Sequence, residues 1–348
     1  MNLPWEPLLT VDRSELPELA LYGVISVIDG SGRLLVSRGE QTAKLWTRSC
    51  LKPWQLLGHL HILKQHYPKL EDRHYALMLS SHSGQQIHLD ALDEMLQIAG
   101  VDLNVLQNTP RYPSDLSLKY KLKSAGEKPT SRWGSCSGKH LGFVMAMNAV
   151  GQDSTRYLEP DQPHFERLKK TLAYLVNDDW QNIRQTTDGC RLPNYAFTAP
   201  ELARLYAQLA TDLKFESLPD APADVKDVVA NFSMLSRVMS AYPEYVGGEN
   251  RLDTDLMRGK YSIDGVQLLA KEGADGLLTI GVRPCDLYSK GLGIVIKLSS
   301  GEDLYHIGLI ALEVLDSLKL LKDSAKKENK LKHLKFTYHY ELAEFARR

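Results

Sequence analysis

The clearest indication of the fold is an apolar run near the start of the chain, residues 21–38, LYGVISVIDGSGRLLVSR. It consists of two aliphatic segments around a glycine-rich turn, which predicts a β-hairpin. Near the other end, residues 276–282 and 293–298 predict two more strands, and the apolar spacing over 303–318 predicts a helix after them. Strands at both chain ends indicate one antiparallel sheet assembled from the two termini.

The middle of the chain has a helical pattern. Apolar residues recur at intervals of three and four over four segments, residues 54–65, 89–99, 164–176 and 200–210. The fold is therefore expected to be α+β, with an antiparallel sheet built from both ends, flanking helices and a mostly helical central region. Within a single unit of 1–348, residues 1–60 and 255–348 would form the sheet subdomain and 61–254 the helical one. Residues 111–133 and 259–271 show no periodicity and are expected to be irregular.

Composition excludes several classes of protein. With 348 residues and 43% hydrophobic residues, the chain is long and apolar enough for an extensive core, which excludes disorder. A formal net charge of −1 gives no reason to expect a nucleic-acid or anionic-membrane partner. The start of the chain has no signal-peptide pattern, and no later stretch is long and apolar enough to span a membrane. We therefore expect a cytoplasmic protein.

A Ser-x-x-Lys run is the first candidate for chemistry. Ser49 and Lys52 are three residues apart and Pro53 follows, so a helix is expected to begin close to Ser49 and to place both side chains on one face. A lysine amine that loses its proton can act as a base toward a serine hydroxyl. The alternative is a capping serine beside a surface lysine.

Two further runs carry polar side chains at the ends of predicted elements. The segment 80–83, Ser-Ser-His-Ser, follows an apolar run and includes Ser81, although it could simply cap the next helix. The segment 271–276 places Lys271 and two glycines just before a predicted strand, where glycine would let a substrate approach the backbone. An ordinary hairpin turn is the alternative there.

The cysteines raise the question of a metal. Cys136, Lys139 and His140 fall in one short run, and Cys190 follows later beside Asp188. Thiolates with an amine or imidazole suit a soft cation, of which zinc is the natural choice. Lysine is an unusual ligand because it must first lose its proton. Buried free thiols or a Cys136–Cys190 disulfide are the alternatives.

In their order, these runs resemble the family of bacterial asparaginases typified by the inducible enzyme of Rhizobium etli. The matching runs are Arg48-Ser49-x-x-Lys52-Pro53-x-Gln55, Ser81-His82-Ser83-Gly84, Cys136-Ser137-Gly138-Lys139-His140, Asp188-Gly189-Cys190, Gly247-Gly248-x-x-Arg251-x-Asp253-Thr254-x-Leu256-Met257 and Lys271-x-Gly273-Ala274. The resemblance implies a fold similar to serine β-lactamases and glutaminases, and hydrolysis of the small-molecule substrate L-asparagine to L-aspartate and ammonia.

The resemblance also implies roles for individual residues. Ser49 with Lys52, and Ser81 with Lys271, match the family's two catalytic serine–lysine pairs. Zinc would be bound by the trio Cys136, Lys139 and Cys190, and the substrate pocket would include Arg48, His140 and Asp188. No organic cofactor is implied, and the assembly would be a homodimer.

The sequence departs from the family pattern at several positions. Leu21 stands where a histidine is common, Ser135 where asparagine is frequent and Arg191 where glycine is frequent. These departures motivate two alternatives: another serine amidohydrolase, acting on glutamine or a β-lactam, or a catalytically silent relative that binds an amino acid. A third is a zinc-dependent hydrolase in which the serines take no part.

Overall fold

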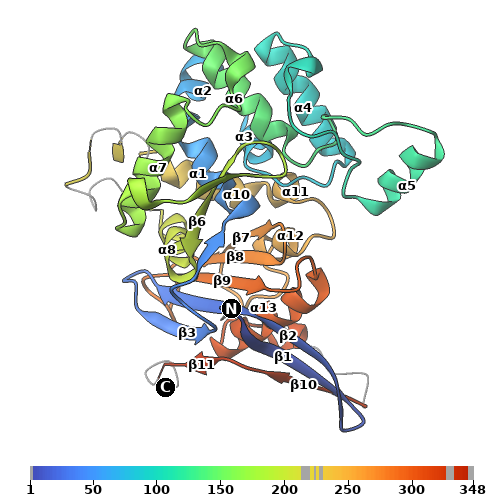
Figure 1. Cartoon of the computed structure of the whole chain (residues 1–348), viewed down its shortest axis with the longest axis vertical. Helices are drawn as coiled ribbons and strands as arrows, with labels where there is room; N and C mark the ends of the chain where they lie inside the picture. Colours follow the sequence, from blue (N-terminus) through green and yellow to red (C-terminus); the bar gives the residue numbers. More distant parts are fainter. Residues whose placement is uncertain (1–2, 213–219, 223–224, 227–229, 327–332, 344–348) are drawn as a thin grey trace. The chain divides into compact units, whose positions relative to one another are not determined.

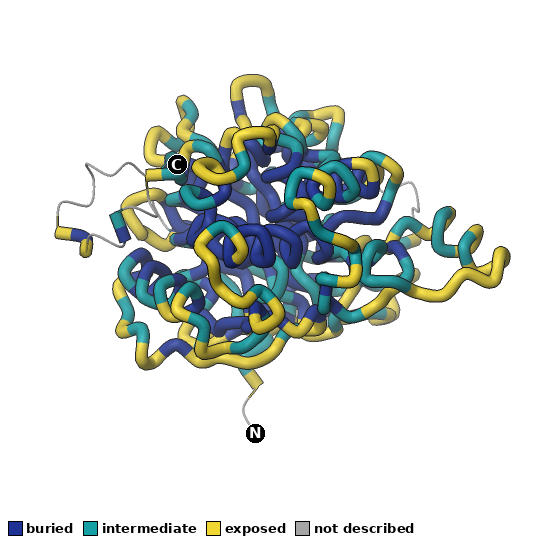
Figure 2. The backbone as a smooth tube through the Cα atoms, turned by 90° about the horizontal axis from the view of Figure 1, so that it is seen from above, coloured by how far each residue is buried: buried dark blue, intermediate teal, exposed yellow. Residues whose placement is uncertain are grey.

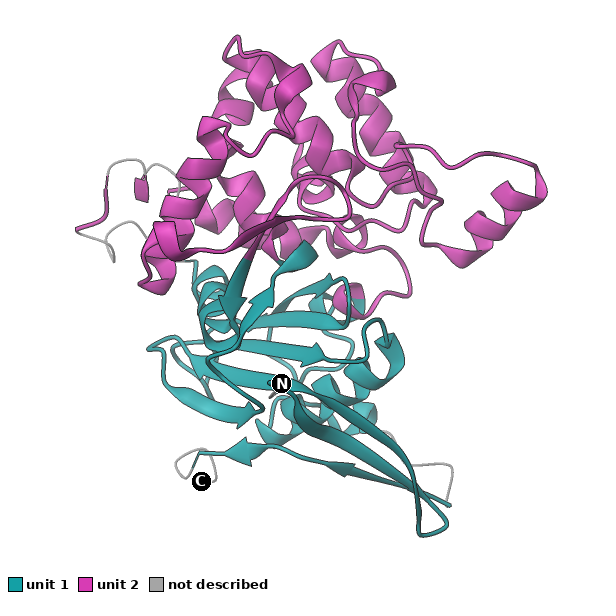
Figure 3. Cartoon of the chain, in the orientation of Figure 1, with its two compact units in different colours: residues 1–50, 196–212, 255–348 teal, residues 51–195, 213–254 magenta. Residues whose placement is uncertain are grey.

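The computed structural model describes residues 3–212, 220–222, 225–226, 230–326 and 333–343. The chain divides into two compact units (Figure 3). Unit 1 comprises residues 1–50, 196–212 and 255–348, and unit 2 comprises residues 51–195 and 213–254. Compared with the expected division, residues 51–60 join the helical unit, and residues 196–212 join the sheet unit.

Unit 1 contains an eight-stranded antiparallel sheet built from both ends of the chain (Figure 1). Its strands are β1 Glu6–Arg13, β2 Leu16–Asp29, β3 Leu34–Arg38, β7 Leu268–Gly273, β8 Leu277–Val282, β9 Leu292–Leu298, β10 Leu334–Tyr338 and β11 Glu341–Leu342. The main order is β10-β1-β2-β9-β8-β7, and β3 pairs with β2 and β11. The predicted hairpin is β2–β3, and the two predicted C-terminal strands are β8 and β9.

Helices cover the centre of this sheet. Strand β9 is buried along almost its whole length, so neither face of its backbone is left to water. Helix α8 (Ala199–Ala210) packs against β2, β8 and β9, and α13 (Leu304–Ser317) contacts β9. Thr198 and Glu201 cap α8 reciprocally, and a proline occupies its first turn as predicted. The packing of α8 explains why residues 196–212 belong to unit 1.

Unit 2 is mostly helical. Its helices are α1 Lys52–Leu57, α2 Leu60–His66, α3 Asp72–Met78, α4 Gln86–Ala99, α5 Leu116–Ser124, α6 Ser137–Ala149, α7 Pro163–Val176, α10 Phe232–Ala241 and α11 Pro243–Val246, and α12 Leu252–Met257 starts in it. Helix α6 lies at its centre, because all residues from 137 to 147 are buried and α1, α2, α3 and α4 contact it. Burial along the backbone can be followed in Figure 2.

Shorter elements complete the chain. The strands are β4 Lys44–Trp46, β5 Gln185–Thr187 and β6 Pro193–Thr198, and the 3-10 turns are η1 Arg48–Leu51, η2 Leu103–Val105, η3 Ser154–Arg156, η4 Trp180–Asn182 and η6 Asp323–Ala325. Strand β6 pairs with β4 through its second half and with β5 through its first half. No helix in the described ranges is both long and apolar enough to cross a bilayer.

The predicted α+β layout is confirmed, with local corrections. The helix expected over 54–65 is two helices, α1 and α2, with Gly58 and His59 between them. The segment expected to be irregular over 111–133 contains α5, whose surface residues gave no apolar periodicity. The segment expected to be irregular over 259–271 runs into β7, so Lys271 lies inside a strand rather than before one.

Candidate functional site

In unit 2, the buried amine of Lys52 contacts the serine loop. Lys52 begins α1 and its side chain is 0% exposed. Its Nζ donates to Ser81 Oγ at 3.0 Å, to Ser135 O at 3.4 Å and to Ser80 O. One hydroxyl and two backbone carbonyls therefore lie around the amine. The structure thus brings Lys52 to Ser81, which sequence reasoning had assigned to the other serine–lysine pair.

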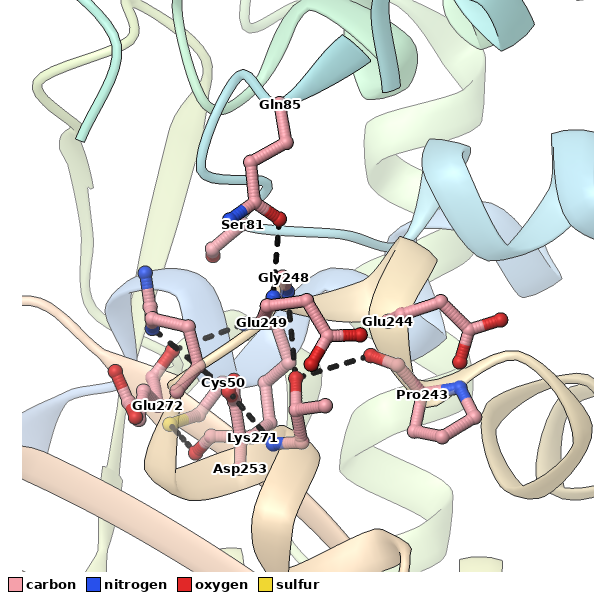
Figure 4. Close-up of polar contacts among 12 residues, drawn as sticks. Cys50, Ser81, Gln85, Pro243, Glu244, Gly248, Glu249, Asp253, Lys271 and Glu272 are labelled. Atoms are coloured by element: carbon pink, nitrogen blue, oxygen red, sulfur yellow. Dashed lines mark hydrogen bonds and ion pairs between the residues drawn. The ribbon is translucent and has the colours of Figure 1, made fainter. Parts of the chain in front are cut away.

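A glycine-containing segment holds the loop that carries Ser81. Three backbone N–H groups make the connections. Ser81 N donates to Val246 O and Ser83 N to Gly247 O, each at 2.9 Å. Glu249 N donates to Gln85 Oε1 at 3.0 Å (Figure 4). The Thr254 hydroxyl in turn donates to Pro243 O at 3.1 Å. The run 247–257, quoted above without a role, therefore holds the loop after Ser81, and the adjacent Val246 holds Ser81 itself.

Two buried imidazoles lie beside this loop. His82 Nε2 is 2.8 Å from Ser137 Oγ, and the His82 ring stacks on His88 with centroids 5.2 Å apart. Burial, followed by the nearby His88 and Lys52, holds the pKa of His82 well below its ordinary value. A neutral His82 therefore links the serine loop to the first turn of α6.

The start of α6 brings the predicted zinc trio together. A Cβ at Gly138 would lie 2.5 Å from Leu77 O, so only glycine allows α6 to approach α3 this closely. The next residue, Lys139, is buried, and its Nζ lies 3.5 Å from Cys190 Sγ and donates to Gln55 Oε1 at 3.2 Å. Cys136 and Cys190 belong to one buried cluster.

The side chains of this cluster shift one another's pKa values. Cys136 accepts a hydrogen bond from Cys190 and faces the Lys52 and Lys139 amines, which holds the pKa of Cys136 well below its ordinary value despite burial. The same hydrogen bond, with burial, raises the pKa of Cys190. Burial alone would lower the pKa of Lys139, but Cys190, Cys136 and Asp188 outweigh it and raise that pKa. Both cysteines are free thiols, so the disulfide alternative is not adopted.

The donor set is compatible with a soft metal ion. Two sulfurs and one amine nitrogen converge, and such ligands suit zinc. Within the described ranges, no group of three or more His, Cys, Asp or Glu side chains is arranged to hold a metal ion, so Lys139 would have to be the third protein ligand. Binding would require Lys139 to release its proton.

His140 and Asp188 border the thiol cluster. His140 is buried, and its Nδ1 lies 2.7 Å from the Tyr157 hydroxyl, which accepts the Gln107 N–H at 2.8 Å. Among the described residues, His140 Nε2 has no hydrogen-bond partner. Burial and then Lys139 hold the pKa of His140 well below its ordinary value. The partly exposed Asp188 lies in the turn between β5 and β6.

Arg191 in that turn explains one departure from the family pattern. Its φ is +80°, in the region that favours glycine, which is the residue frequent at this position in relatives. The guanidinium donates to Gln107 O at 3.0 Å. The substitution therefore keeps the backbone shape of the turn and adds a cation near His140.

In unit 1, Arg48 and Ser49 belong to the 3-10 turn η1. Arg48 has a positive φ of +47° and forms an ion pair with Asp275, whose φ is also positive at +58°. Ser49 is partly exposed. Strained non-glycine residues of this kind cluster at functional sites. Asp275 is a residue that sequence reasoning quoted in a run but did not select.

Lys271 lies in unit 1, fully buried in β7. Its Nζ donates to Glu272 O at 3.1 Å, and its carbonyl accepts the Cys50 thiol at 3.3 Å (Figure 4). A Cβ at Gly273 would lie 2.9 Å from Cys50 Sγ. The close approach expected at this glycine is therefore made by the cysteine sulfur of the Ser-x-x-Lys run. Because Ser81 is in unit 2, its expected pairing with Lys271 stays a prediction.

Comparisons with known proteins concern the chain as a whole. The chain matches the family described as L-asparaginase II over residues 9–343. No curated protein matches the sequence. Similar solved structures include a Bacillus glutaminase, with 13% sequence identity and a TM-score of 0.39 over 86% of this chain and 91% of that chain. A probable glutaminase from Bacillus subtilis has 13% identity and a TM-score of 0.39 over 86% of this chain and 84% of that chain. Another is a mutant class A β-lactamase of the last common ancestor of Gram-negative bacteria, with 12% identity and a TM-score of 0.34 over 84% of this chain and 93% of that chain. At these TM-scores, the likenesses carry no argument about mechanism or substrate.

Proposed function

The chain belongs to the L-asparaginase II family, and from this premise we propose that it hydrolyses L-asparagine to L-aspartate and ammonia through an acyl-enzyme on Ser49. The observation that supports a serine–lysine mechanism most strongly is the buried hydrogen bond of 3.0 Å between Lys52 Nζ and Ser81 Oγ. It joins a second hydroxyl, that of Ser81, to the amine of Lys52, which lies three residues along the chain from Ser49.

In the first half of the proposed reaction, Ser49 Oγ forms a bond to the side-chain amide carbon of asparagine. Lys52, in its neutral form, takes the serine proton. Ser81 hands a proton from Lys52 to the amide nitrogen, so that the carbon–nitrogen bond breaks and ammonia leaves. A positioned acid of this kind typically contributes a rate factor of about 10²–10⁴.

In the second half, water attacks the ester carbon of the acyl-enzyme. Lys52 accepts the proton of the water, the bond to Ser49 breaks, and the proton returns to Ser49 Oγ while aspartate leaves. Lys271 is proposed to relay protons and stabilise negative charge, as the resemblance implies. In each half-reaction Lys52 takes up one proton and gives one up, so asparagine and water are the only reactants.

Three side chains are proposed to hold the substrate. Arg48 would pair with the α-carboxylate, exchanging Asp275 for the ligand. Asp188 would pair with the α-ammonium group, and the partnerless Nε2 of His140 would hydrogen-bond an oxygen of the substrate. A zwitterionic amino acid requires such placed opposite charges rather than a charged surface.

A zinc ion is proposed at Cys136, Lys139 and Cys190. When bound, it would supply positive charge that polarises or positions an oxygen of the substrate. The chain itself holds the two thiols and the amine within one buried cluster. The family resemblance further motivates the proposal of a homodimer, which light scattering tests. A cytoplasmic location, expected from the sequence, is also a proposal, and cell fractionation tests it.

The identity of the acylated serine tests the mechanism. Wild type, Ser49→Ala and Ser81→Ala would be incubated with L-asparagine, quenched in acid and digested for mass spectrometry. We expect an aspartyl ester on the peptide containing Ser49, no ester in Ser49→Ala, and slow acylation in Ser81→Ala. An ester on Ser81, or full activity in Ser49→Ala, would contradict the assignment.

A further inference from the structure

The backbone carbonyl of Lys271 accepts two side-chain hydrogen bonds. The Cys50 thiol donates to Lys271 O at 3.3 Å, and the Thr279 hydroxyl donates to the same oxygen at 3.1 Å. All three residues are 0% exposed. Both side-chain donors therefore bond one backbone oxygen.

The register places the Lys271 carbonyl on the β8 side of β7, because Arg283 N donates to Gln267 O at 3.0 Å and Lys271 lies four residues further along the same ladder. Strand β7 is last in the order of the described sheet and pairs only with β8, where Lys271 faces Thr279. An edge strand lacks a ladder partner along one side, and its backbone is less constrained there. Two side-chain donors therefore add restraint at the one residue of β7 proposed to act in catalysis.

Cys50 is also fixed by contacts with α8 and with Gly273. The Tyr206 hydroxyl on α8 donates to Cys50 O at 2.8 Å. Gly273 has no side chain where the sulfur lies, since a Cβ there would be 2.9 Å from Cys50 Sγ. The residue next to Ser49 is thus packed directly on the strand of Lys271, within unit 1.

We propose that Cys50 and Thr279 are positioning residues that together fix Lys271 by hydrogen-bonding its carbonyl. The inference rests on the proposed function, in which Lys271 moves protons. Neither side chain touches the substrate in this proposal. Their effect passes through the backbone of β7, so it falls on the chemical step and leaves substrate binding unchanged.

The test is a double-mutant cycle with Cys50→Ala and Thr279→Val. Valine keeps the branched shape of threonine without the hydroxyl. Each single variant is expected to lower kcat about fivefold to tenfold, the fold-change of one net hydrogen bond, with KM unchanged. Because both donors bond the same carbonyl, the double variant is expected to fall well short of the product of the two single effects.

Two variants separate positioning from a general packing defect. Cys50→Ser keeps a donor at the same place and is expected to restore most of kcat, whereas Cys285→Ala removes the other thiol of unit 1 and is expected to change nothing. Multiplicative effects in the cycle, a change confined to KM, or failure of Cys50→Ser to recover more than Cys50→Ala would overturn the proposal.

The same set distinguishes failure of the inference from failure of the proposed function. Wild type that releases no ammonia, or Lys271→Met with full activity, refutes the proposed function. An inactive Lys271→Met together with normal kcat in Cys50→Ala and Thr279→Val refutes the positioning alone. The cycle is also run on the free energy of unfolding, which needs no substrate; a coupling energy of zero there refutes the shared carbonyl.

Discussion

Acidification is expected to destabilise unit 2 through His88. This residue of α4 is fully buried, stacks on His82, and has its Nε2 2.8 Å from Glu244 O. Burial is the main cause that lowers its pKa to about 4, from about 6.5 in an unfolded chain. Below pH ~6.5 the unfolded state therefore takes up the proton first, and stability falls until pH ~4.

The size of the effect follows from that difference. At about pH 5, one such histidine lowers the free energy of unfolding by about 2 kcal/mol relative to about pH 7. His88→Gln keeps a donor for the Glu244 carbonyl and does not titrate, so this contribution disappears in the variant. The exposed His66→Gln on α2 is the matched control and should behave as wild type.

Urea-induced unfolding, followed by tryptophan fluorescence at both pH values, measures this contribution. We expect His88→Gln to lose about 2 kcal/mol less than wild type on acidification, and His66→Gln to lose as much as wild type. If His88→Gln loses as much stability as wild type, the buried neutral histidine is not the cause, and the reasoning is refuted.

Three further outcomes are expected. Gly273→Ala should lower the free energy of unfolding by about 1–3 kcal/mol, because its Cβ would crowd the sulfur of Cys50; an unchanged urea midpoint would contradict this packing. Arg191→Gly should raise thermal stability by about 1 kcal/mol by removing the positive-φ strain, and a lower melting temperature would show that its bond to Gln107 matters more. Lys139→Met should abolish stoichiometric zinc binding in calorimetry while wild type binds zinc and releases protons; equal binding in both would exclude the amine as a ligand.

The sequence predicted the fold where the pattern was regular. The continuous aliphatic segments of β8 and β9 predict strands that are buried on both faces, and the amphipathic spacing of α4, α7 and α8 predicts helices with one face toward the core. Strands β1 and β10 were missed, since polar and partly exposed residues interrupt their apolar pattern. Helix α5 was missed for the same reason, as no residue in it is buried.

The candidate site was predictable in part. Residue types and order selected Ser49, Lys52 and the zinc trio, and the structure gathers the trio within unit 2. A cue for Gln55 was present, because it lies three residues after Lys52 on the same helix. Other contacts join segments that are far apart in the sequence, such as Lys52 with Ser81 and Cys50 with the Lys271 carbonyl. Because these contacts depend on tertiary packing, the spacing of residues along the chain does not predict them.

Release of ammonia from L-asparagine by the purified wild-type chain tests the central claim most directly. The rate would be measured with and without added zinc, with aspartate quantified in parallel and Ser49→Ala as the inactive reference. The account predicts ammonia and aspartate in equal amounts from wild type and neither above background from Ser49→Ala. A folded wild-type protein that releases no ammonia from asparagine, or a Ser49→Ala variant that releases it at the wild-type rate, would contradict the account.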